Sequence, residues 1–197
     1  MTSRPRKDLH PSDVTIVCDT REQRPFNLAP LKMIRATLST GDYAIMGLEH
    51  IAAIERKSIQ DLIGCIPRDE DGSSRFLREM KRLLAYETRA IVIEGSQSQI
   101  ELKQYRGDVH PNAAMGSIYG IIAMGIPVMF CGDRERAQQF TARLLFIAAR
   151  RRWREAQMFI PTLKVVGATR DEEERREDLQ DVPRGETEGP VLPGRGP

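Results

Sequence analysis

Short apolar runs rich in β-branched residues alternate with segments of helical periodicity along most of this chain, and this pattern restricts the fold strongly. The clearest strand is Ala90–Glu94, which Gly95 ends. Further strands are expected at 14–18, 34–38, 43–46, 51–54 and 127–130, and helices at 59–66, 75–86, 112–124 and 133–153. This order predicts an α/β fold in which a mixed central sheet is flanked by helices on both faces.

The organisation along the chain predicts one globular domain between two irregular ends. The 197 residues are enough to bury a core. We expect a flexible lead at 1–12, a folded domain at 13–162 and a disordered acidic tail at 163–197. The tail contains a charge run, Asp171–Asp181, followed by a stretch rich in proline and glycine.

Composition excludes several classes of protein. No apolar run is long enough to span a bilayer, and the first residues lack the apolar core of a secretory signal. Cys18, Cys65 and Cys131 are widely spaced, so neither a disulfide framework nor a structural zinc site is expected. We therefore expect a soluble intracellular protein that does not bind membranes or a small-molecule cofactor.

The formal charge is unevenly distributed. From residue 162 onward six basic and nine acidic residues give a net charge of −3, which leaves +5 for the rest of the chain. A mildly basic body permits binding to a polyanion such as DNA.

The loop at 47–50 predicts a hairpin that brings two acidic residues together. In a hairpin around this loop Met46 faces Ile51 and, counting outward, Asp42 faces Glu55. Two directly opposed carboxylates repel each other, unless a cation lies between them or one of them keeps a proton.

Lys57 completes a group that fits phosphodiester hydrolysis. It lies two residues beyond Glu55, so both side chains point to the same face of an extended strand. Carboxylate oxygens suit Mg²⁺, with Mn²⁺ as a substitute. A metal ion there would polarise a phosphate and activate water, while the lysine orients that water or neutralises developing charge.

Two other polar features have alternative explanations. Ser58-x-x-Asp61 fits the capping box of a helix, which accounts for Asp61 without any functional role. The basic run at 150–154 includes Arg151 and Arg152, which would either grip DNA phosphates or complement the dipole of a helix end.

The spacing of these residues resembles that of a known family. Gly41-Asp42-Tyr43 followed by Glu55-Arg56-Lys57-x3-Asp61 is similar to the signature of the XPF-type structure-specific nuclease domain, which has a restriction-endonuclease-like fold. The turn Asp19-Thr20-Arg21-Glu22 resembles the first motif of that family. The resemblance extends over roughly residues 14–150.

The resemblance implies a role for each matching residue. Asp42 and Glu55 would be metal ligands and Lys57 the catalytic lysine. Asp19 and Glu22 would be acidic partners in the same cleft, Asp19 also as a metal ligand. The supporting or phosphate-binding positions would be Arg21, Arg56, Asp61 and Arg75.

The implied activity is Mg²⁺-dependent endonucleolytic hydrolysis of branched, flapped or forked DNA during repair or recombination. One alternative is a nuclease of the same fold that cuts Holliday junctions or nicked duplex. Another is a catalytically silent module that binds DNA or dimerises. A homodimer through the nuclease domain is also expected, with residues 113–126 and 140–148 as candidate surface.

Overall fold

A six-stranded sheet organises the part of the chain that the structure describes. The computed structural model describes the backbone of residues 8–66 and 75–180. The strands are β1 Thr15–Asp19, β2 Lys32–Ala36, β3 Tyr43–Ile45, β4 Ala52–Ser58, β5 Thr88–Glu94 and β6 Val128–Phe130. The helices are the 3-10 helix η1 Pro11–Asp13, then α1 Ile59–Cys65, α2 Arg75–Leu83, α3 Gln97–Glu101, α4 Pro111–Ala123 and α5 Arg134–Gln180.

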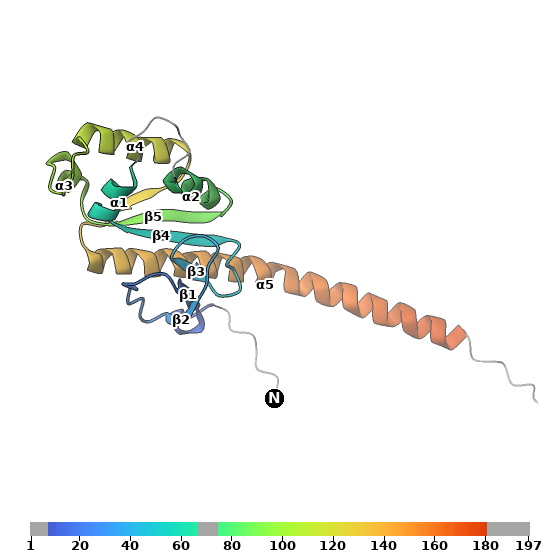
Figure 1. Ribbon diagram of the computed structural model, residues 1–197. Coiled ribbons are helices and arrows are strands. Elements are labelled where there is room, and N and C mark those ends of the chain that lie inside the picture. The colour runs from blue at the N-terminus through green and yellow to red at the C-terminus, as the bar shows by residue number, and fades with distance from the viewer. Residues whose placement is uncertain (1–7, 67–74, 181–197) are drawn as a thin grey trace, which may run out of the picture. The chain divides into compact units, whose positions relative to one another are not determined.

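The sheet is mixed, with strand order β2-β1-β3-β4-β5-β6. Strand β3 is antiparallel to both β1 and β4, whereas the β1–β2, β4–β5 and β5–β6 pairs are parallel. Helices α1 to α4 cover one face of the sheet and α5 covers the other (Figure 1). The predicted mixed sheet with helices on both faces is therefore confirmed.

The central strands divide the apolar core into two layers. Because successive side chains of a strand point to opposite faces, Ala53 and Ile91 pack with α1, α2 and α4. Their neighbours Ile54 and Val92 pack on the other face, where α5 contributes Leu145. Strands β4 and β5 are thus buried on both faces, which explains their continuous apolar runs.

The hairpin of β3 and β4 has the predicted register. Tyr43 pairs with Ile54, and the main-chain nitrogen of Asp42 donates a hydrogen bond to the Ile54 carbonyl at 2.8 Å. Gly41 has a φ of +77°, and a Cβ there would lie 3.0 Å from the Ile54 oxygen, so this position requires glycine. Continuing the register by one residue places Asp42 opposite Glu55.

Helix α5 extends into the stretch for which the sequence analysis expected disorder. Disorder was expected from residue 163, but the backbone is helical as far as Gln180. Glutamate and arginine have good intrinsic helix propensity, which allows a charge run to continue a helix that has already begun. Residues 181–197 of the expected tail, and 1–7 of the expected lead, lie outside the described residues.

Contacts divide the chain after Arg154. Among the described residues, those up to Arg154 form one compact unit, and those from Glu155 onward belong to a second. The short helix α3 was not predicted from the sequence.

None of the helices in the described residues combines the length and apolar character needed to cross a membrane.

Candidate active site

Glu55 and Lys57 lie side by side on one face of β4. Their side chains are both buried, and Lys57 Nζ donates a hydrogen bond to Glu55 Oε1 at 2.8 Å. The predicted orientation of these two residues toward one face is therefore confirmed. Asp42, the residue before β3, lies opposite Glu55, and its Oδ2 accepts a hydrogen bond of 2.7 Å from the main-chain nitrogen of Arg56.

Burial and mutual repulsion make the two acidic groups hard to ionise together. Burial raises the pKa of Asp42 to about 6, and the nearby Glu22 carboxylate adds to this shift. Burial likewise raises the pKa of Glu55 to about 8, with the repulsion of Asp42 as the next cause. Raised pKa values of this kind occur where carboxyl groups are buried close together, as they are at many functional sites.

Lys57 remains charged despite its burial. Burial alone would lower its pKa, but the adjacent Glu55 carboxylate outweighs that effect and the pKa of Lys57 is raised. Glu79 of α2 also approaches the ammonium, with Oε2 3.7 Å from Nζ, and the Phe76 ring centroid lies 5.8 Å from Nζ. The fold therefore places the protonated ammonium of Lys57 between the side chains of Glu55 and Glu79.

Glu79 is a site residue that the sequence analysis missed. It lies on the same side of α2 as Phe76, Met80 and Leu83, whose side chains are buried. A glutamate within the apolar stripe of an amphipathic helix was the signal that could have identified it.

The donor set fits a magnesium ion bound through two carboxylates. Within the described ranges, no three metal-ligating side chains are grouped so that they could hold an ion by themselves. However, Asp42 Oδ1 and Glu55 Oε2 accept no hydrogen bond from the described residues. Mg²⁺ is commonly held by one or two carboxylates, with water and substrate phosphate as the other ligands. Asp42 and Glu55 would thus hold it.

Asp19 does not have the ligand position that the resemblance implied. Oδ1 accepts hydrogen bonds from the main-chain nitrogen and Nε of Arg21, at 2.7 and 2.8 Å. Oδ2 accepts from Arg21 Nη2 at 2.8 Å and from the main-chain nitrogen of Leu38 at 2.7 Å. All four acceptor positions of the carboxylate are therefore in use, so Asp19 fixes the turn after β1 instead of offering an oxygen to a metal ion.

Arg56 is also fixed by other side chains and does not point to the face of β4 that carries Glu55 and Lys57. It forms two parallel hydrogen bonds with Glu94, at 3.0 Å from Nε and 2.9 Å from Nη2. Its Nη1 lies 3.8 Å from Oε2 of Glu22, and Arg134 also pairs with Glu94. Because β4 side chains alternate, this ion network lies on the face opposite Lys57.

The network connects the first motif to helix α5. Arg134 donates hydrogen bonds of 2.8 Å to the carbonyls of Arg24 and Pro25, just beyond Glu22. Its guanidinium carbon also lies 5.1 Å from the centroid of the Phe26 ring. Glu94 and Arg134, which the sequence analysis did not single out, therefore support the site from behind the sheet.

The remaining predicted residues lie around the site or away from it. The Arg21 side chain is 69% exposed while bound to Asp19, so its guanidinium is accessible at the edge of the site. Asp61 accepts hydrogen bonds from the main-chain nitrogen and hydroxyl of Ser58, which confirms the capping box. Arg151 and Arg152 pair with Glu87, which comes just before β5 and lies near the start of β4, whereas Lys57 lies near the end of β4. The side chain of Arg75 lies outside the described residues.

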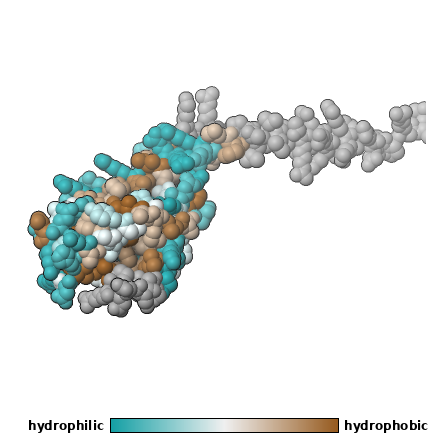
Figure 2. All heavy atoms as spheres, turned by 90° about the horizontal axis from the view of Figure 1, so that it is seen from above, coloured by the Kyte–Doolittle hydropathy of each residue, from teal (hydrophilic) through white to brown (hydrophobic). Residues whose placement is uncertain are grey.

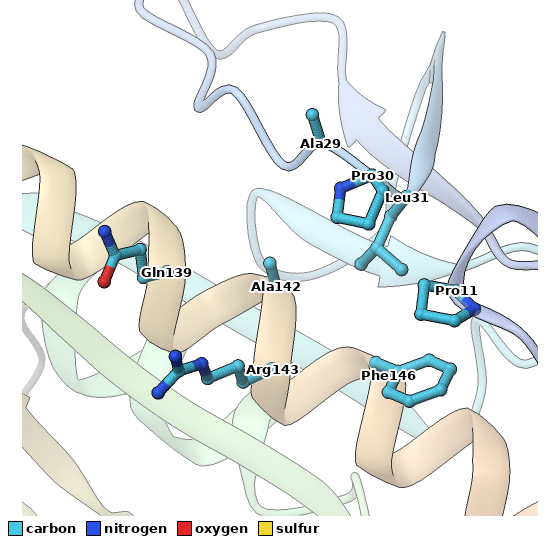
Figure 3. A pocket seen from close by; sticks show the side chains of 8 residues that line it. All are labelled: Pro11, Ala29, Pro30, Leu31, Gln139, Ala142, Arg143 and Phe146. Atoms are coloured by element: carbon cyan, nitrogen blue, oxygen red, sulfur yellow. The ribbon is translucent and has the colours of Figure 1, made fainter.

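An apolar pocket of about 270 Å³ lies elsewhere in the domain. Figure 3 shows its walls, which come from η1, the loop before β2 and helix α5. The lining residues are Pro11, Ala29, Pro30, Leu31, Gln139, Ala142, Arg143 and Phe146. None of them carries a carboxylate, so this pocket is separate from the acidic site.

Comparison with known proteins identifies the family. The family model for the ERCC4 domain matches residues 18–144, which is more than half of the chain. The chain belongs to the ERCC4 domain family. The matched part of this ERCC4 domain includes Asp42, Glu55, Lys57 and Glu79, whereas Arg151 and Arg152 lie beyond it. The resemblance to the XPF-type nuclease domain is thereby confirmed.

Solved structures support the same fold for this ERCC4 domain. XPF from Aeropyrum pernix is similar with a TM-score of 0.53 and 22% sequence identity, over 77% of this chain and 73% of that chain. The complex of XPF from Aeropyrum pernix with DNA is similar with a TM-score of 0.50 and 22% identity, over 69% of this chain and 64% of that chain. No curated protein sequence matched.

Proposed function

We propose that this ERCC4 domain is a Mg²⁺-dependent DNA endonuclease. The observation that carries the proposal is the opposition of Asp42 and Glu55 across a hairpin, with the ammonium of Lys57 hydrogen-bonded to Glu55. A buried and a half-buried carboxylate that face each other, each with an unused oxygen, are costly to maintain without a cation. A phosphodiester is the substrate class whose negative charge such a cation and a lysine would both stabilise.

Each residue has a distinct task in this proposal. A bound Mg²⁺ would polarise the scissile phosphate and lower the pKa of a water molecule. Asp42 and Glu55 would hold the ion through the oxygens that accept no hydrogen bond from the described residues. Lys57 is protonated, so it donates hydrogen bonds and neutralises charge at the phosphate instead of acting as a base. Glu55 and Glu79 hold the Lys57 ammonium from two sides.

We propose branched, flapped or forked DNA as the substrate, cut during repair or recombination. Family membership supports this choice, and a similar protein, XPF from Aeropyrum pernix, has been solved in complex with DNA. The test is a cleavage assay with Mg²⁺ on labelled flap, fork, Holliday junction, nicked and linear duplexes. Preference for flaps or forks supports the proposal, and preference for junctions or nicked duplex favours the second candidate substrates.

The non-catalytic alternative makes a different prediction. A module that only binds DNA would bind it equally well with and without EDTA and would cut none of the substrates. Under our proposal cleavage stops with EDTA and returns with Mg²⁺ or Mn²⁺. Absence of cleavage with either metal, in a preparation that is folded and binds DNA, would favour the silent module.

We also propose that the domain forms a homodimer. Tyr119 and Ile122 on α4 are 58% and 47% exposed, and Met129 on the neighbouring β6 is 36% exposed. Figure 2 views the side of the molecule where α1 to α4 lie and shows apolar areas between hydrophilic ones. Light scattering of the full chain should give the mass of a dimer. Ile122→Asp should give a monomer, whereas Leu102→Asp, at another exposed apolar residue, should not change the mass.

A further inference from the structure

The loop between α3 and α4 is anchored to the helix that follows the catalytic lysine. Gln60, in the first turn of α1, donates from Nε2 to the main-chain oxygen of Arg106 at 3.1 Å. The main-chain nitrogen of Arg106 donates back to Gln60 Oε1 at 3.0 Å. One side-chain amide thus satisfies both main-chain groups of one loop residue, as a neighbouring strand would.

A second anchor fixes the same loop from within. Tyr105 donates from its hydroxyl to the Val109 carbonyl at 2.8 Å, and both side chains pack against the core beneath α1 to α4. Arg106 follows Tyr105 directly, so its main chain is held on both sides. Such anchoring reduces the conformational entropy that the loop would lose on binding a ligand.

The side chain of Arg106 is left without a partner among the residues that the structure describes. It is exposed and makes no hydrogen bond or ion pair with any described residue. Other exposed arginines of the domain, such as Arg136 and Arg154, pair with acidic side chains. Asp108, two residues further along the loop, does not pair with Arg106 either.

The anchor also places this arginine near the candidate active site. Only Ser58 and Ile59 separate Gln60 from Lys57. The Cα atoms of Lys57 and Gln60 are therefore at most about 11 Å apart, even for an extended chain. One DNA strand carries a phosphate for about every 3.4 Å along the axis. A backbone with one phosphate at Lys57 therefore presents others within the range of Arg106.

We infer that Arg106 binds a DNA phosphate a few nucleotides from the scissile one, and that Gln60 is the positioning residue that holds Arg106 there. This inference rests on the proposed function, because it takes DNA as the ligand of the same site. The contact between Arg106 and the phosphate would set the position of the bound DNA strand relative to Lys57. The arginine supplies a charge-assisted contact to phosphate oxygens, and the amide of Gln60 supplies its position.

The test is a salt titration of DNA affinity with the full chain in EDTA, so that cleavage does not interfere. Arg106→Ala should weaken binding of a labelled fork about 5-fold, and the slope of log K against log salt should fall by about 0.9, as expected for one phosphate contact. Arg106→Lys should keep the slope. Arg143→Ala is the matched control, because Arg143 is also exposed and unpaired in the described residues but lies on α5, across the sheet.

Gln60→Ala tests the positioning role, because it removes no charge. We expect a KM about 3-fold higher with Mg²⁺, an unchanged kcat and a circular dichroism melting curve like that of the wild type. An Arg106→Ala variant with wild-type affinity and slope would overturn the phosphate contact, and an unchanged KM in Gln60→Ala would overturn the positioning role. If the wild-type chain bound no DNA at all, the proposed function itself would fail.

Discussion

The main-chain nitrogen of Arg56 donates a hydrogen bond of 2.7 Å to the carboxylate of Asp42. Arg56, which lies between Glu55 and Lys57, therefore fixes the carboxylate of Asp42 on the facing side of the hairpin. The three side chains of the candidate active site are held by the backbone of one hairpin, and not by mobile loops. A site built on strands in this way keeps its groups in a defined geometry before substrate binds.

Replacement of the lysine should separate catalysis from binding. Lys57→Ala removes the ammonium that would stabilise charge at the phosphate, and loss of one such donor costs about 10²–10³-fold in kcat. Affinity for a labelled fork in EDTA should change less than about 3-fold, because the Lys57 ammonium is already paired with Glu55 and Glu79 and so adds less charge to DNA binding than an unpaired arginine. Single-turnover cleavage and fluorescence anisotropy measure the two effects. Unchanged kcat in a clean preparation would remove Lys57 from the mechanism.

Asp42→Asn should make the metal-free protein more stable while it abolishes cleavage. Asparagine can still accept the hydrogen bond from the Arg56 nitrogen, but it no longer repels Glu55. We expect a gain of about 1 kcal/mol in the free energy of unfolding in EDTA, as seen when a site is relieved of functional strain. Urea denaturation at pH 8 measures the gain. A variant less stable than the wild type would show that the opposed carboxylates are not in conflict.

Glu79→Gln tests the residue that holds Lys57 from helix α2. The amide keeps the shape of the side chain but loses the charge that faces the ammonium at 3.7 Å. We expect kcat to fall about 10-fold, by roughly 1.4 kcal/mol of transition-state stabilisation, with KM unchanged. Glu101→Gln, on the exposed helix α3, is the control. A rise of about 10-fold in KM with an unchanged kcat would contradict a role of Glu79 in positioning Lys57.

Glu94→Gln should destabilise the domain in a pH-dependent way. Burial alone would raise the pKa of Glu94, but the hydrogen bond and charge of Arg56, together with Arg134, outweigh it and the pKa is lowered. A lowered pKa means that this carboxylate stabilises the fold above its ordinary value of 4.5, and that the contribution is lost as the pH falls below that value.

At neutral pH the variant should lose about 3–5 kcal/mol in the free energy of unfolding, because the Arg56 guanidinium is buried beside it. The loss should shrink toward pH 3, where the wild type also loses the ionised carboxylate. Glu87→Gln breaks only exposed pairs with Arg151 and Arg152 and should cost less than about 1 kcal/mol. Denaturation curves across this pH range measure both variants. If the free energy of unfolding of Glu94→Gln differed from that of the wild type by the same amount at every pH, Glu94 would not be the ionised partner of Arg56.

The sequence predicted those features of the site that depend on local geometry. The four-residue loop sets the register that places Asp42 opposite Glu55, and the two-residue period of a strand places Lys57 beside Glu55. The capping box of Ser58 and Asp61 is equally local. Each of these follows from residues close together in the chain, so their geometry could be counted from the sequence alone.

Features that depend on distant contacts could not be predicted in this way. Asp19 appeared to be a metal ligand until the Leu38 nitrogen and the Arg21 side chain were found to occupy its oxygens. Glu79 and Glu94 come from other elements, whose packing against β4 no local pattern specifies. The length of α5 beyond residue 163 could not be predicted from the sequence, because a charge run is compatible both with disorder and with a helix that has already begun.

The central claim is that Asp42 and Glu55 together bind one divalent cation next to Lys57. Its most direct test is a titration of the full chain with Mn²⁺, followed by electron paramagnetic resonance in the absence of DNA. The wild type should bind one ion per chain, Asp42→Asn and Glu55→Gln should each weaken binding at least about 10-fold, and Asp61→Asn should bind like the wild type. Equal Mn²⁺ affinity in all four proteins would contradict the claim.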